Sequence, residues 1–98
     1  MVDTAKILKK AIARYGYVDQ TVKCMEEMGE LTQALAKELI APSATEKLKA
    51  RAHIVEEISD VEIMLDQIKL MHDIKNDEVE KTKEFKLARL NARIDDNY

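Results

Sequence analysis

Two groups of acidic residues in this 98-residue chain have types and spacing that suit the binding of divalent cations. The first group contains Glu27 and Glu30, and the second contains Glu57 and Asp60. Residues three apart share one face of a helix, so the two carboxylates of each pair project side by side. Because an apolar residue follows the leading Glu of each pair by four positions, we expect all four carboxylates to point toward a seam between helices.

Converging carboxylates of this kind repel one another. At about 4 Å and an effective dielectric of about 20, one like-charged pair costs roughly 4 kcal/mol. Either protonation, with raised pKa values, or bound cations would relieve this repulsion. An all-oxygen ligand set favours a hard ion, so we expect Mg²⁺, with Mn²⁺ as the alternative. A di-iron centre is disfavoured, because neither His53 nor His72 follows an acidic residue by three positions.

Other residues of the two acidic groups have separate roles. Glu26 and Glu56 each precede a predicted ligand, and a next-door residue on a helix points about 100° away. We therefore place them beside the ligands, where they would orient water or act as general base.

Gly29 costs a helix about 0.5–1 kcal/mol relative to Ala, which predicts close approach of a ligand or helix there. Each acidic group alone is typical of a solvated helix face, whereas the matched spacing of both favours a site.

A cationic stripe lies near the C-terminus of this acidic protein. Lys86, Arg89 and Arg93 stand at i, i+3 and i+7, so they share one helix face. One interpretation is favourable charge near a helix C-terminus. The other is phosphate binding, because Arg forks grip two phosphate oxygens and Lys supplies a point charge.

The elements that position these residues are predicted to be helices. Hydrophobic residues make up 46% of the chain and charged residues 36%, which is typical of amphipathic helices, and only two Gly and one Pro are present. The fold class is therefore all-α, with one domain over residues 1–98. Four helices are expected: residues 3–15, residues 20–40, a third from a Ser43 cap to Lys75, and a fourth from an Asn76 or Asp77 cap to Ile94.

Apolar stripes run along the second and third predicted helices. They consist of Val22, Met25, Met28, Leu31, Leu35 and Leu39, and of Ile54, Ile58, Val61, Leu65 and Ile68. Cys24, Met25, Met28, Met64 and Met71 are predicted core residues. The third helix would be about 45 Å long, and one chain offers little to cover its whole stripe. We therefore expect a homo-oligomer, either dimer or tetramer, that completes a helical bundle.

Composition also narrows the partners and the compartment. A net charge of −3 disfavours nucleic acid as a partner. No apolar run approaches the ~18 residues of a membrane span, and the N-terminus lacks a signal-peptide core, so no membrane association is expected. The single Cys24 cannot form an internal disulfide, which is typical of a reducing, cytoplasmic location.

The two acidic motifs resemble a known signature. Glu27-x-x-Glu30 and Glu57-x-x-Asp60, separated by 26 residues, are similar to the motifs of the MazG-like all-α nucleoside triphosphate pyrophosphohydrolases. The resemblance covers Gln20 to Ile94 and is nearest to the compact single-domain members found in bacteria and phages. It implies a Mg²⁺-dependent enzyme that converts an NTP or dNTP and water to the monophosphate and pyrophosphate, with these four acidic residues as metal ligands.

The resemblance also implies residues that contact the nucleoside triphosphate substrate. Lys86 and Arg89 match the family's late Lys-x-x-Arg segment near the triphosphate, and Arg93 is a weaker match. Gln20 stands where the family often has a polar residue before the first motif. The preferred base and sugar stay open. Two alternatives also stay open: a non-catalytic helical interaction or regulatory protein, and a metal-storage or redox bundle, which the lack of histidine ligands disfavours.

Overall fold

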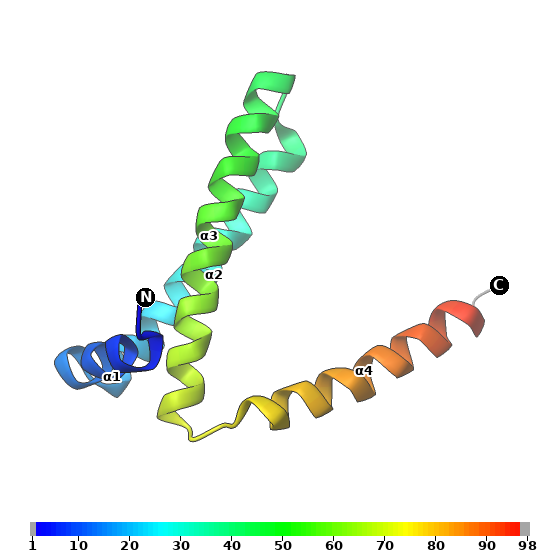
Figure 1. Ribbon diagram of the computed structural model, residues 1–98. Coiled ribbons are helices and arrows are strands. Elements are labelled where there is room, and N and C mark those ends of the chain that lie inside the picture. The colour runs from blue at the N-terminus through cyan, green and yellow to red at the C-terminus, as the bar shows by residue number, and fades with distance from the viewer. Residues whose placement is uncertain (1, 97–98) are drawn as a thin grey trace.

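The computed structural model describes residues 2–96, and four helices account for most of them. The helices are α1 (Thr4–Tyr15), α2 (Tyr17–Ile40), α3 (Ala44–Met71) and α4 (Asn76–Asp96). Residues 2–96 contain no strand, so the prediction of an all-α protein with four helices is confirmed. Figure 1 shows α2 and α3 side by side as an antiparallel hairpin, with α1 across one end and α4 projecting away.

Local side-chain and backbone chemistry decides where the first three helices begin. The side chains of Asp3 and Ser43 each accept a hydrogen bond, 3.1 Å long, from the backbone N–H three residues later. These are N-caps, and the predicted Ser43 cap is confirmed. Gly16 separates α1 from α2 at a φ of 91°, a conformation that glycine adopts readily. Because the break is confined to Gly16, α2 begins at Tyr17, three residues before its predicted start.

The third helix is shorter than predicted. It ends at Met71 instead of Lys75, because Asp73 adopts a φ of 52° that a helix cannot contain. The Lys75 backbone N–H then donates a 2.8 Å hydrogen bond to Glu78 Oε2. Since α4 begins at Asn76, its N-cap position is Lys75. The predicted caps, Asn76 and Asp77, lie inside the helix instead.

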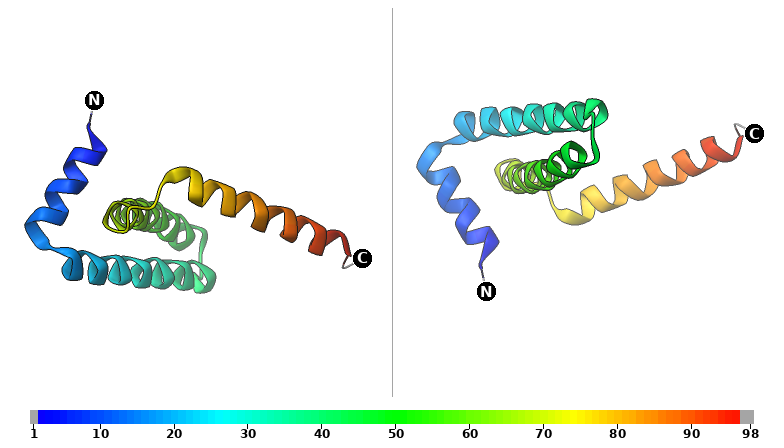
Figure 2. Two further views of the ribbon diagram at one scale, coloured as in Figure 1. Left: turned by 90° about the horizontal axis from the view of Figure 1, so that it is seen from below. Right: turned by 90° about the horizontal axis from the view of Figure 1, so that it is seen from above.

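The fourth helix packs on none of the others within residues 2–96 (Figure 2). The shape is correspondingly extended, with a radius of gyration of 17.2 Å against about 13 Å for a compact chain of this length. The exposed surface is 7910 Å², against about 5,700 Å² for a compact monomer of this mass. A single copy therefore leaves much of its surface uncovered.

The buried face of α2 is not the predicted apolar stripe. Cys24, Glu27 and Ala34 are buried, whereas Met25 and Met28 are 58% and 44% exposed. The prediction that these two methionines are core residues is therefore wrong for a single chain. Met28 follows Glu27 by one position and lies about 100° around the helix from it, so α2 cannot turn both toward α3.

In the third helix the predicted stripe is only partly buried. Val61 is buried and Ile54 and Ile68 are half-buried, while Ile58 and Leu65 are each 42% exposed. Glu57 is buried beside this stripe. Because α2 and α3 run antiparallel and Glu27 and Glu57 face each other, residues that follow these two glutamates by the same number of positions point to the same side of the hairpin. We call this side the apolar face and define it by Met28, Leu35, Leu39, Ile58 and Leu65. None of the helices in residues 2–96 combines the length and apolar content needed to cross a bilayer.

Candidate metal centre

Carboxylates of α2 and α3 meet on the hairpin side opposite the apolar face. Oxygen atoms of Glu27, Glu57 and Asp60 all lie within 4.8 Å of one another. Glu30 and Asp60 each follow a buried glutamate by three positions, which places them about 60° around the helix from it. Met28 and Ile58 follow the same glutamates by one position and lie about 100° around in the opposite direction. Glu30 and Asp60 therefore point away from the apolar face. Glu27 and Glu57 are only 7% and 6% exposed, whereas Glu30 and Asp60 are exposed. The structure thus groups three of the four predicted ligands and leaves Glu30 at the rim, where it lines a small pocket with Glu57.

A basic side chain one helical turn earlier contacts each buried glutamate. Lys23 Nζ lies 3.1 Å from Glu27 Oε1, and His53 Nε2 lies 3.3 Å from Glu57 Oε1. In both glutamates the second oxygen, Oε2, is buried and has no hydrogen-bond partner among residues 2–96. Buried carboxylate oxygens without a partner are unfavourable, so these two atoms mark a position where a cation would stabilise the fold.

The electrostatics of the cluster also favour a bound cation. Burial raises the pKa of Glu57, and the nearby carboxylates of Glu30, Asp60 and Glu27 raise it further, while His53 acts in the opposite direction. The hydrogen bond and charge of Glu27 raise the pKa of Lys23. The cluster therefore carries an excess of negative potential that protons or metal ions can neutralise.

The donor set fits a hard divalent ion. All available ligand atoms are carboxylate oxygens, which suits Mg²⁺ or Mn²⁺, and the two open Oε2 atoms of Glu27 and Glu57 belong to that set. The sequence analysis missed the contributions of Lys23 and His53. The signal was present, because each precedes a buried glutamate by four positions, the spacing at which oppositely charged helix residues pair.

The remaining predicted residues near the cluster differ in exposure. Glu26 and Glu56 are exposed beside the buried glutamates. Gln20 is only 8% exposed and lies seven residues before Glu27, about 10 Å along the same helix face. A Cβ atom added at Gly29 would meet no atom within 4 Å, so the predicted approach of another helix to Gly29 is wrong within residues 2–96.

One further buried polar group was not anticipated. Gln67 of α3 is 4% exposed, and its Oε1 has no hydrogen-bond partner among the described residues. Its Nε2 lies 3.8 Å from the sulfur of Met64. Gln67 follows Glu57 by ten residues, about 15 Å along the helix, so it lies outside the acidic cluster.

The basic stripe does not meet the acidic cluster within residues 2–96. Lys86, Arg89 and Arg93 are exposed on α4, which contacts neither α2 nor α3. The Arg89 guanidinium lies 5.8 Å from the centre of the Phe85 ring, a cation–π distance. A phosphate site that combines this stripe with the acidic cluster requires another copy or a movement of α4.

No protein-family model, curated protein or solved structure matches this chain. Function therefore has to be inferred from the acidic cluster and from the motifs that carry the family resemblance.

Proposed function

We propose that this protein is a Mg²⁺-dependent nucleoside triphosphate pyrophosphohydrolase of the MazG-like type. One observation supports the proposal above all. Glu27 and Glu57 each have a buried Oε2 without a hydrogen-bond partner in the described part of the chain, and both residues have oxygens within 4.8 Å of an Asp60 oxygen. Such a group of carboxylates is more stable with a divalent cation than without one, and cation-bound carboxylates are a common way to hold a polyphosphate.

The proposed reaction adds water to the α-phosphorus and breaks its bond to the oxygen shared with the β-phosphorus, releasing pyrophosphate. A bound Mg²⁺ would neutralise phosphate charge and activate water. Lys23 and His53 fix the glutamates that would bind the ion. Glu26 and Glu56, exposed beside those glutamates, are proposed to orient the attacking water or accept its proton.

Activity measurements on matched variants test this proposal. Purified protein is incubated with Mg²⁺ and a panel of ribo- and deoxyribonucleoside triphosphates, and pyrophosphate release is measured. Glu57→Gln and Asp60→Asn should lower turnover by at least about 100-fold, because each removes a charged ligand. Glu62→Gln, an exposed position of α3 outside the cluster, should leave turnover unchanged. Release of orthophosphate, or full activity in Glu57→Gln, would contradict the proposal.

We also infer that a second copy of the chain covers the apolar face. The chain exposes 7910 Å², about 2,200 Å² more than a compact monomer of its mass. That excess is larger than the roughly 800 Å² that each partner buries in a standard protein–protein interface. The acidic cluster lies on the other side of the hairpin, so a partner on the apolar face leaves the cluster accessible to substrate.

The exposed apolar face also favours a second candidate function. A non-catalytic helical interaction or regulatory protein would use this face to bind another protein. It would bind that partner without releasing pyrophosphate from any nucleoside triphosphate, so the activity assay separates the two candidates.

A further inference from the structure

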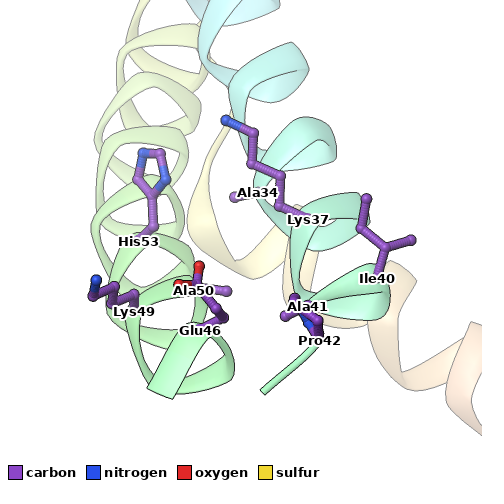
Figure 3. A pocket seen from close by; sticks show the side chains of 9 residues that line it. All are labelled: Ala34, Lys37, Ile40, Ala41, Pro42, Glu46, Lys49, Ala50 and His53. Carbon is purple, nitrogen blue, oxygen red and sulfur yellow. The ribbon is translucent and has the colours of Figure 1, made fainter. Parts of the chain in front are cut away.

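A groove of about 340 Å³ lies between α2 and α3 near the turn that joins them (Figure 3). It exists because small residues face each other there: Ala34 of α2 is 2% exposed and Ala50 of α3 is half-buried. Most of its lining is apolar and includes Pro42, while Lys37, Glu46, Lys49 and His53 supply polar groups.

The groove is continuous with the acidic cluster. The small pocket lined by Glu30 and Glu57 shares Ala34, Lys37 and His53 with the groove. In Figure 3 the Lys37 and His53 side chains lie at the end of the groove away from Pro42. Lys37 forms no ion pair with a carboxylate of residues 2–96, so its ammonium group is available to an anionic ligand.

We propose that the groove binds the nucleoside part of the substrate, with Lys37 contacting the phosphate attached to the sugar. This inference rests on the proposed function, because the acidic cluster would then hold the same phosphate through Mg²⁺. Ligand pockets of about 300–1,000 Å³ are mainly apolar with a few polar groups, and this groove fits that description.

Glu46 favours binding of the nucleoside part of a nucleoside triphosphate in the groove over its pyrophosphate part. It lines the groove as a carboxylate, which accepts hydrogen bonds from the amino, imino or hydroxyl groups of a nucleoside. The same carboxylate offsets part of the positive charge of Lys37 and Lys49, which line the same groove, so the lining suits pyrophosphate less than a purely cationic one would. Glu46 is therefore assigned as a specificity-determining residue that favours a nucleoside with a hydrogen-bond donor at this position.

Blocking the groove without changing its charge tests the assignment. Ala50→Leu fills the groove, and Ala52→Leu makes the same change at an exposed position of α3 that does not line it. Isothermal titration calorimetry with AMP, GMP, CMP and UMP in the presence of Mg²⁺ should show binding weakened at least about 10-fold in Ala50→Leu and unchanged in Ala52→Leu. Binding of Mn²⁺ alone and of inorganic pyrophosphate should be unchanged in both, and Glu46→Gln should alter the ranking of the four monophosphates.

The outcomes are distinguishable. Equal affinity of both alanine variants for all four monophosphates, or no monophosphate binding by the wild-type protein, would overturn the groove assignment. So would a loss of pyrophosphate binding in Ala50→Leu with monophosphate binding retained. Failure of the wild-type protein to bind Mn²⁺ or release pyrophosphate would count against the proposed function instead. The monophosphate titration needs no turnover, so it tests the groove assignment whether or not the protein releases pyrophosphate.

Discussion

At the scale of single residues, Glu57 combines burial with like-charged neighbours. It is 6% exposed and lies near Glu27, Glu30 and Asp60, and among residues 2–96 only its Oε1 has a partner, which is His53. Burial and the neighbouring carboxylates raise its pKa above the ordinary 4.5. The free energy of the folded state therefore depends on what neutralises this group.

A pH dependence of stability follows from the raised pKa of Glu57. Below pH 4.5 Glu57 is protonated in both the folded and unfolded chain. As the pH rises through the raised pKa, the unfolded chain ionises more easily, so the free energy of unfolding of metal-free protein should fall. Urea unfolding between pH 4 and 8 should show a smaller fall in Glu57→Gln than in the wild type. Glu62→Gln should follow the wild type, and identical profiles for all three proteins would contradict this role of Glu57.

Divalent ions should stabilise the folded chain through the same residues. At 100 times its dissociation constant, Mg²⁺ should raise the free energy of unfolding by about 2.7 kcal/mol, because only the folded state brings the carboxylates together. Thermal unfolding with Mg²⁺, and then with added EDTA, measures the gain and its reversal. Glu27→Gln should lose most of the effect. An equal gain in that variant would place the bound ion elsewhere.

At the scale of elements, the α2–α3 hairpin sets the register between the two acidic motifs. Its turn ends at Ser43, whose hydroxyl caps α3. Lys47 Nζ also donates to the Glu38 backbone carbonyl at 3.0 Å, which ties the first turn of α3 to the last turn of α2. These contacts at the turn thus support the hairpin geometry that places Glu57 near Glu27, close to the middle of both helices.

Removal of the Ser43 cap tests this dependence. Ser43→Ala should lower the free energy of unfolding by about 1 kcal/mol, because the Glu46 backbone N–H loses its acceptor. Ser43→Asp keeps an acceptor at the same position and should retain stability. Chemical unfolding of both variants gives the comparison. Equal losses would show that the cap does not stabilise the hairpin.

At the scale of the whole molecule, the exposed apolar face and the isolated α4 support the proposal that a second copy of the chain completes the assembly. Sedimentation equilibrium should give a mass of at least twice the 11.2 kDa of one chain. Leu35→Lys, in the apolar face, should raise the dissociation constant by about 10-fold or more. Leu48→Lys is the control, because Leu48 is 69% exposed and lies outside that face. A monomeric wild-type protein would contradict the inferred assembly.

The sequence by itself determined the local features. Gly16 and Pro42 mark the breaks on either side of α2, and the Ser43 cap marks the start of α3, because backbone dihedrals and capping bonds depend on residues a few positions apart. The pairing of acidic residues on one helix face has the same local origin, since it follows from a spacing of three.

Only the tertiary structure decided which faces are buried. An apolar stripe does not specify its partner, and α2 turns Cys24 and Glu27 toward α3 while Met28 stays exposed. The long-range packing of two antiparallel helices also separates buried Glu57 from Glu30 at the rim, and leaves α4 without contacts to the other three described helices. These outcomes depend on residues 30 or so positions apart, whose mutual orientation no local spacing determines.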